Sequence, residues 1–97
     1  MAKGMIISFE GTDGSGKTTQ IKALSEYLDK KGYETIMLRE PGGTKIGEEI
    51  RSILLNKNNT EMASLTEMLL YASSRAQMME EKVEPLLKEG KIVILDR

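Results

Sequence analysis

The chain has 97 residues, 30% of them charged, and its basic and acidic side chains balance to a net charge of −1. This length allows at most one modest domain, and the even charge excludes a general nucleic-acid or membrane surface, which needs basic excess. The chain lacks cysteine and any apolar run long enough for a signal peptide or membrane span. We therefore expect a soluble cytoplasmic protein that binds neither a nucleic acid nor a membrane.

The first half of the chain predicts strands and helices in alternation. Residues 5–10 form an apolar run typical of a parallel strand covered on both faces. Apolar residues then recur at helical spacing from Lys17 to Lys31, and Gly32 is the expected C′ residue. The segments that follow are a second strand ("ETIML", 34–38), a loop ("REPGGT", 39–44) and a second helix (45–55).

The second half predicts one long helix and a third strand. Ser64 and Glu67 have the spacing of a capping box, and the helix runs to about Glu89, with a bend caused by Pro85. "KIVILD" (91–96) is the third strand. Two apolar helix faces should point inward: Ile46, Ile50, Ile53 and Leu54 on the second helix, and Leu65, Met68, Leu69, Ala72, Met79, Val83 and Leu86 on the third.

This order of elements predicts an α/β fold with a parallel sheet, because helical crossovers between strands give parallel pairing with right-handed connections. Ligands of such folds bind at the carboxyl ends of the strands. The glycine-rich segment, "REPGG" and the terminal "DR" each follow a strand. All three should therefore face one crevice.

Residues 11–18, "GTDGSGKT", fit the phosphate-binding pattern G-x-x-x-x-G-K-[ST] between a strand and a helix. Glycines let backbone N–H groups surround a phosphate, and the helix N-terminus favours the same anion. The alternative is a plain glycine-rich turn. The candidate nucleotide-binding residues are Gly11, Thr12, Asp13, Gly14, Ser15, Gly16, Lys17, Thr18 and Thr19.

Two oxygen donors are candidate ligands of Mg²⁺. The hydroxyl of Thr18 follows the phosphate-binding lysine, and Asp96 ends an apolar strand, where nucleotide-binding proteins of this kind place a magnesium-binding carboxylate. The alternative for Asp96 is a solvated carboxylate at a strand end. The motif thus predicts binding of a nucleoside triphosphate with Mg²⁺.

Four segments narrow the class: "FEGTDGSGKTTQ", "LREPGGTKIGEEIRSILL", "LLYASSRAQ" and "GKIVILDR". In this order and spacing they resemble bacterial thymidylate kinases, which phosphorylate dTMP to dTDP with ATP. The resemblance implies a P-loop nucleoside triphosphate hydrolase-like three-layer fold, with the third strand between the first and second. It also implies that residues 1–97 are the N-terminal part of a single kinase domain, and that the protein is a homodimer built on its second and third helices.

The same resemblance assigns roles to particular residues. Arg39 and Arg97 would bind the phosphate of dTMP, Pro41 would lie beneath the nucleoside, and Arg51 would lie near the base. Tyr71 would stack on thymine, Arg75 would donate to a thymine carbonyl, and Asp13 would bond the sugar 3′-hydroxyl. Lys17, Arg97 and Asp13 are the catalytic candidates.

Each role has a structural alternative. Arg39 would instead pair with Glu40 or a glutamate of the second helix, and Arg51 would join the second helix to the third. Asp13 would bond loop N–H groups. Tyr71 and Arg75 share a helix face, and would otherwise lie at the core edge and in solvent.

The resemblance leaves two other functions open, namely a kinase for a different small acceptor and a nucleotide-binding module without turnover. Some family members carry an arginine where this chain has Gly14, and those without it place basic residues in a lid. Because the lid would lie beyond Arg97, we expect residues 1–97 by themselves to be inactive on dTMP.

Overall fold

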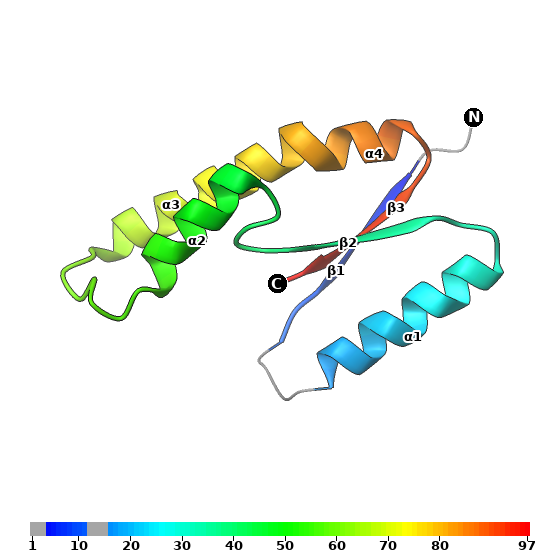
Figure 1. Ribbon diagram of the computed structural model, residues 1–97, viewed down its shortest axis with the longest axis horizontal. Coiled ribbons are helices and arrows are strands. Elements are labelled where there is room, and N and C mark those ends of the chain that lie inside the picture. The colour runs from blue at the N-terminus through cyan, green and yellow to red at the C-terminus, as the bar shows by residue number, and fades with distance from the viewer. Residues whose placement is uncertain (1–3, 12–15) are drawn as a thin grey trace.

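The computed structural model describes residues 4–11 and 16–97. In chain order its elements are β1 (Met5–Phe9), α1 (Lys17–Lys30), β2 (Thr35–Arg39), α2 (Lys45–Leu55), α3 (Ser64–Met78), η1 (Met79–Val83), α4 (Glu84–Lys88) and β3 (Ile92–Asp96), as Figure 1 shows. The predicted alternation is confirmed. No helix in these two ranges combines the length and apolar character needed to cross a membrane.

The three strands form one parallel sheet in the order β1-β3-β2. The central position of β3 explains its sequence, because residues 92–95 are all buried and a strand covered on both faces needs an apolar run. In the register of the sheet, Asp96 lies opposite Phe9 on one side and Arg39 on the other. All three strands therefore end at the same level.

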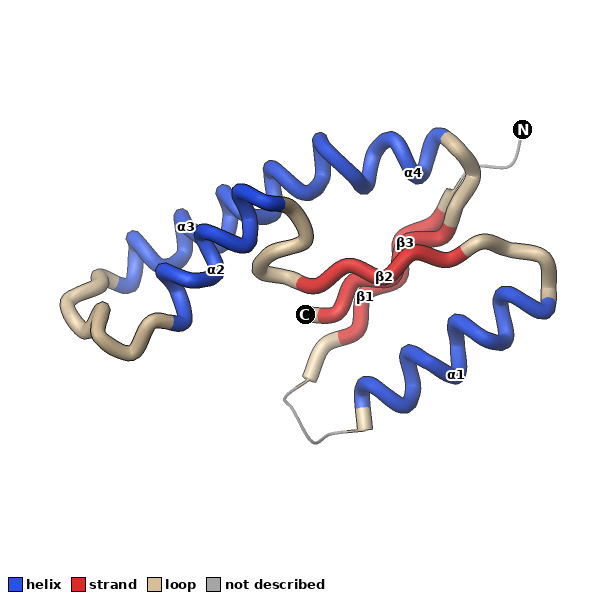
Figure 2. The backbone as a smooth tube through the Cα atoms, in the orientation of Figure 1, coloured by secondary structure: helices blue, strands red, loops and turns tan. Residues whose placement is uncertain are grey.

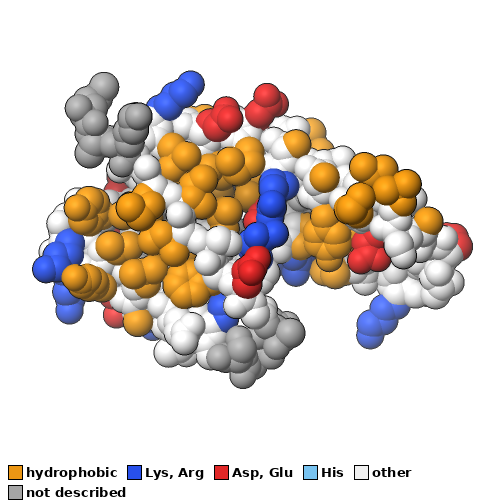
Figure 3. All heavy atoms as spheres, turned by 180° about the vertical axis from the view of Figure 1, so that it is seen from behind, with side chains coloured by type: hydrophobic (Ala, Val, Ile, Leu, Met, Phe, Trp, Pro, Cys, Tyr) orange, Lys and Arg blue, Asp and Glu red, His pale blue; other side chains and the backbone are white. Residues whose placement is uncertain are grey.

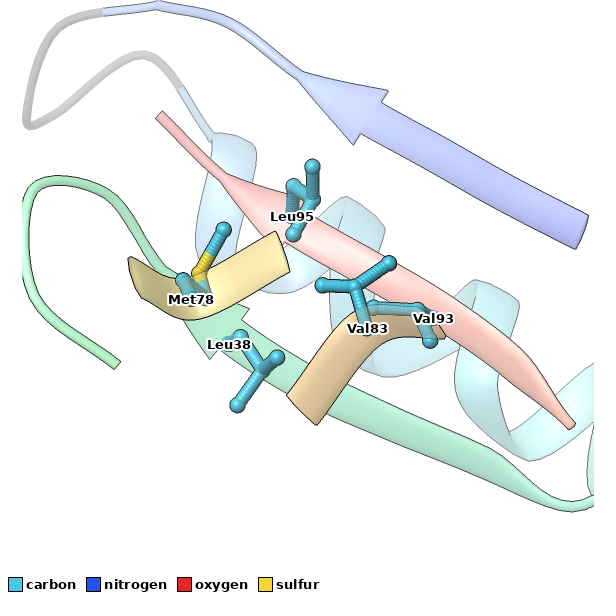
Figure 4. Close-up of a cluster of buried hydrophobic side chains, with 5 residues drawn as sticks. All are labelled: Leu38, Met78, Val83, Val93 and Leu95. Carbon is cyan, nitrogen blue, oxygen red and sulfur yellow. The ribbon is translucent and has the colours of Figure 1, made fainter. Parts of the chain in front are cut away.

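Helices cover both faces of the sheet, with α1 on one side and η1 and α4 on the other (Figure 2). An apolar core cluster lies between the sheet and the long helix formed by α3, η1 and α4, and comprises Leu38, Met78, Val83, Val93 and Leu95 (Figure 4). Successive strand residues face opposite sides, so Ile92 and Ile94 point toward the α1 side. The predicted three-layer arrangement is confirmed.

Two of the predicted helix signals have different outcomes. Gly32 follows α1 with a φ of 89°, and the Tyr33 N–H donates to the Leu28 carbonyl over 3.0 Å. That pattern confirms the predicted C-terminal glycine motif. The capping box at Ser64 is wrong: Ala63 is the N-cap of α3, without a side-chain cap hydrogen bond, and Ser64 is already helical.

The irregularity expected from Pro85 takes the form of a π-helical segment, η1, between α3 and α4. Proline has no N–H to donate to the carbonyl four residues earlier, and its ring crowds that carbonyl. The Glu84 N–H donates instead to the carbonyl of Met79, five residues back. A π-helical bulge of this kind relieves the conflict while the helix continues.

The predicted inward faces of α2 and α3 are only partly correct. Val83 is buried, and Met79 and Leu86 pack against the core. The remaining large side chains of these faces include several that are at least 45% exposed: Ile46, Ile53, Leu65, Met68 and Leu69. The reason is that α2 and the first half of α3 extend past the sheet and pack on each other (Figure 1). Hydrophobic side chains also gather on the face shown in Figure 3.

The core cluster makes a stability prediction. Replacing Met78, which is fully buried, with alanine should lower the free energy of unfolding by about 2–5 kcal/mol, because it leaves a cavity between helix and sheet. Lys88→Ala, on the exposed side of α4, should change it by less than about 0.5 kcal/mol. Urea denaturation measures both. Equal effects of the two substitutions would contradict this placement of the core.

Candidate active site

Three charged side chains form a row where the strands end. The pairing of the sheet continues one residue past each strand, since the Arg97 N–H donates to Phe9 O and the Glu40 N–H donates to Asp96 O, both over 2.9 Å. Arg97 thereby lies between two carboxylates. Its guanidinium pairs with Glu10 at 3.0 Å and with Glu40 at 3.3 Å.

Lys17, in the first turn of α1, reaches the same edge of the sheet. Its Nζ lies 2.6 Å from Asp96 Oδ1, and it donates to the carbonyls of Gly11 (3.1 Å) and Arg97 (2.7 Å). An ammonium has three donors, so these acceptors satisfy all of them. The predicted phosphate-binding lysine and the predicted magnesium-binding carboxylate are therefore in direct contact.

The loop of residues 40–44 is held by both neighbouring helices. From α3, the buried Ser74 accepts from the Gly42 N–H over 2.9 Å. From α2, Glu48 accepts from the Gly43 N–H over 3.0 Å, while Arg51 donates to the Pro41 carbonyl over 3.0 Å. Backbone polar groups in this loop thus find partners that fix its path across the strand ends.

The two glycines of this loop are required by their conformation and surroundings. Gly42 and Gly43 have φ values of 127° and 84°, a region that side chains with a Cβ rarely adopt. A Cβ on Gly43 would also lie 2.9 Å from Met78 Sδ. The positive φ thus favours glycine at both positions, and a side chain at Gly43 would also displace the side chain of Met78.

Thr44 begins α2 and completes the anchoring of the loop. Its buried side-chain oxygen accepts from the Gly47 N–H over 2.8 Å, as an N-cap does. Glu48 lies in the first turn, where a negative charge also interacts favourably with the helix dipole. Local helix chemistry therefore stabilises the residues that hold the loop.

Two adjoining hollows lie along this edge of the sheet and share Gly11, Glu40 and Arg97. The first, of about 800 Å³, has a largely apolar wall formed by Pro41, Tyr71, Ala72, Ala76 and Met79, with Arg75 at its border. The second, of about 690 Å³, is strongly charged: four basic residues (Lys17, Arg39, Arg51 and Arg97) and two acidic ones (Glu40 and Asp96) line it. A ligand with an apolar ring at one end and anionic groups at the other fits this pair.

Carboxylates hold the arginines that face the two hollows. Glu48 pairs with Arg39, and this hydrogen bond, followed by that of the Gly43 N–H, lowers the pKa of Glu48. The same pair raises the pKa of Arg39. The hydrogen bond that Arg75 donates to Glu40 raises the pKa of Arg75. Both arginines thus remain charged and oriented by acceptors.

The structure brings most of the predicted residues to this edge of the sheet. Tyr71, Arg75, Pro41 and Arg97 line the apolar-walled hollow. Arg51 lines the charged hollow and not the hollow beside Tyr71. Its hydrogen bond goes to the Pro41 carbonyl in the loop, whereas the alternative had expected an ion pair between α2 and α3. The ion pair left open for Arg39 exists, with Glu48 of α2.

The glycine-rich segment is described at its two ends only. Gly16, with a φ of 85°, is the N-cap of α1, and Thr18 lines a third hollow together with Asp96. Thr19 is exposed in the first turn of α1. The predictions for Thr12, Asp13, Gly14 and Ser15 lie outside the described residues.

Glu10 and Ser74 were not predicted from the sequence, and Glu40 and Glu48 entered only as alternative partners of Arg39, Glu48 as one of the glutamates of the second helix. Glu10 and Glu40 each follow a strand, so the rule that drew attention to Asp96 and Arg97 could have found them. Ser74 lies within the quoted "ASSRAQ" segment, but nothing local distinguishes it from the neighbouring Ser73. The contact of Glu48 with Gly43 depends on how α2 meets the loop, and the sequence does not distinguish Glu48 from the neighbouring Glu49.

The parallel sheet with helices on both faces, the glycine- and lysine-containing sequence between β1 and α1, and the charged hollow at the strand ends are those of a P-loop nucleotide-binding fold. The family model described as thymidylate kinase matches residues 9–97. The chain belongs to the thymidylate kinase family.

Individual relatives support the family assignment. The chain is 67% identical over 95 residues to the thymidylate kinase of Thermoanaerobacter sp. (strain X514), covering 98% of this chain and 46% of that protein. It is 52% identical over 97 residues to that of Clostridium novyi (strain NT), covering 100% and 47%. The crystal structure of thymidylate kinase from Ehrlichia chaffeensis superposes with a TM-score of 0.83 at 41% identity, covering 98% and 53%. The chain thus spans about half the length of the relatives it matches.

The contact between Glu48 and Gly43 predicts a pH-dependent signal. The pKa of Glu48 is lowered from its ordinary value of 4.5. The contribution of the ionised carboxylate to the stability of the folded state is therefore fully present above that pH. It is lost as the pH falls through the lower, folded-state pKa. In a pH titration followed by NMR, the chemical shift of the Gly43 amide should therefore change with a midpoint below pH 4.5. In Glu48→Gln that movement should disappear, and a midpoint above 4.5 in the unmodified protein would contradict the contact.

Proposed function

We propose that the full-length protein transfers the γ-phosphoryl group of ATP to dTMP, giving dTDP. The observation that carries this proposal is the pair of adjoining hollows, one walled by apolar side chains and the other lined by four basic residues. A nucleoside monophosphate has this division between a ring and a dianion. A coupled assay of ADP formation with purified full-length protein and dTMP tests it.

At the acceptor end, the nucleoside would occupy the hollow beside α3. Tyr71 is 42% exposed and offers a ring face for thymine, and Arg75, one turn away, offers donors to a carbonyl. Pro41 forms part of the same wall. The 3′-hydroxyl of the sugar is assigned to Asp13 by the family resemblance.

The phosphate of dTMP would lie where the two hollows meet. Arg97 lines both of them, and the guanidiniums of Arg97 and Arg39 suit the two charges of a phosphate monoester. Arg51 faces the same charged hollow and adds to its positive potential. Arg39 contacts Glu48 through Nε and Nη2, which leaves three of its five donors for a phosphate oxygen.

At the donor end, the triphosphate would be held by the segment from Gly11 to Thr19, with Lys17 on the β- and γ-phosphates. The residues present fit Mg²⁺, since the Thr18 hydroxyl and the Asp96 carboxylate line one hollow and are hard oxygen donors. No group of three or more acidic, His or Cys side chains among the described residues could hold a metal by itself. A Mg²⁺ ion bound here would neutralise charge on the phosphate oxygens.

The chemistry requires orientation and charge neutralisation. In-line transfer to a phosphate oxygen needs no covalent enzyme intermediate. Lys17 and Arg97 are linked through the Arg97 carbonyl, so the proposed donor and acceptor contacts are held at a fixed spacing. This arrangement supports direct transfer between two bound nucleotides.

We further propose that the full-length protein is a homodimer that buries the apolar faces of α2 and α3. Ile46, Ile53, Leu65, Met68 and Leu69 are exposed on these helices, where they extend past the sheet (Figure 1). Apolar surface gathered in this way is typical of an interface.

Replacing Lys17 with alanine in the full-length protein should lower turnover by at least about 100- to 1,000-fold, because a positive charge directed at the transferred phosphate is lost. Lys30→Ala, in the last turn of the same helix, is the matched control and should leave turnover unchanged. Near-normal turnover in Lys17→Ala would contradict the P-loop assignment.

Replacing Tyr71 with alanine should weaken dTMP binding by roughly 1–3 kcal/mol, which is the value of one base stacked on an aromatic side chain in proteins that bind single-stranded nucleic acids. ATP binding should change little. Tyr27→Ala, an exposed tyrosine of α1, is the control. Calorimetry with each nucleotide measures both affinities. If the affinities for dTMP and ATP fell equally, Tyr71 would have a structural role instead of a role in base recognition. If the unmodified protein bound dTMP but did not turn it over, a nucleotide-binding module without activity would be favoured.

A further inference from the structure

Glu40 occupies the junction of the two hollows. It is the first residue after β2, and its backbone N–H donates to the carbonyl of Asp96 over 2.9 Å. Its side chain is only 9% exposed, and it lines both the apolar-walled hollow and the charged one. A carboxylate so little exposed, at a site expected to receive a phosphate, requires compensating contacts.

Those contacts come from two arginines that reach Glu40 from different elements. Arg75 of α3 donates through Nε to Oε1 over 2.7 Å and through Nη2 to Oε2 over 3.3 Å. Arg97, after β3, lies with its Nε 3.3 Å from Oε2. One carboxylate thus joins the helix that carries Tyr71 to the end of the central strand.

The geometry at Arg75 leaves donors available to a ligand. A guanidinium has five N–H groups, and the contact with Glu40 uses one on Nε and one on Nη2. Three donors therefore remain on Nη1 and Nη2, and Arg75 is one of the residues that line the apolar-walled hollow. The two-point contact with Glu40 therefore orients the guanidinium of Arg75 and leaves three donors for another acceptor.

The charges give a second reason for a carboxylate here. Arg75 and Arg97 both line the first hollow, and two like charges facing one site repel each other where water is partly excluded. Glu40 lies between them and offsets this repulsion. Glutamine at the same position would keep a hydrogen-bond acceptor but lose the charge that both guanidiniums share.

Resting on the proposed function, we infer that Glu40 is a positioning residue for dTMP: its carboxylate orients Arg75 toward the nucleoside and Arg97 toward the phosphate. Glu40 itself does not contact the transferred group. It acts through the two arginines, so its removal should affect the acceptor nucleotide more than the donor. A purely structural role, holding α3 against the sheet, would affect both nucleotides and the thermal stability together.

The test is Glu40→Gln in the full-length protein, with KM and kcat determined for dTMP and ATP separately. We expect kcat/KM for dTMP to fall roughly 10- to 100-fold, as misplacement of binding groups does, and KM for ATP to change less than about twofold. The matched control is Glu34→Gln. Glu34 is a 66%-exposed glutamate whose ion pair with Lys91, at 3.7 Å, lies at the opposite end of β2. Its substitution should leave the kinetic constants for both nucleotides unchanged.

The outcomes separate the inference from the proposed function. No dTMP phosphorylation by the unmodified protein would overturn the proposed function and the inference with it. If the unmodified protein is active but Glu40→Gln behaves like Glu34→Gln, or weakens ATP and dTMP alike, only the inference fails. If Glu40→Gln does not fold, Glu40→Asp decides: it keeps the charge but shortens the reach. A raised KM for dTMP alone then supports positioning, and an unchanged one overturns it.

Discussion

The site depends on the register of three parallel strands. Because Phe9, Asp96 and Arg39 lie opposite one another, the residues that follow them emerge side by side at one edge of the sheet. A shift of one residue in either pairing would turn each side chain of that strand to the other face. Arg97 would then lose its place between Glu10 and Glu40, and Lys17 would no longer meet Asp96.

The long helix links the stability of the core to the geometry of the site. Met78 and Val83 bury its second half against the sheet, while Ser74 and Arg75, one turn earlier, bind the loop and its carboxylate. Tyr71 precedes these by another turn and lies exposed above the hollow. Packing that fixes the helix therefore also fixes the positions of the residues proposed to bind the base.

Charge pairing shapes how a ligand would be received. The basic side chains at the site already have acceptors: Lys17 has Asp96, Arg39 has Glu48, and Arg75 and Arg97 share Glu40. A phosphate must compete with these carboxylates, which reduces the net gain in binding free energy. In return, the cations are held in defined orientations before the ligand arrives, so less conformational entropy is lost on binding.

The amino-acid sequence by itself determined the α/β class and the order of elements, and its resemblance to a known family pointed to Arg39, Tyr71, Arg75 and Arg97 as candidate site residues. The class and the order of elements follow from local periodicity and turn chemistry, whereas the candidate site residues follow from the segments that carry the resemblance. The inward-facing assignment of Leu65, Met68 and Leu69 failed, because a helical pattern shows an apolar face but not whether a sheet lies beneath it. The partners of Glu10, Glu40, Glu48 and Ser74 were likewise decided only by the tertiary structure, because each contact joins segments whose distance and direction depend on strand register and helix packing.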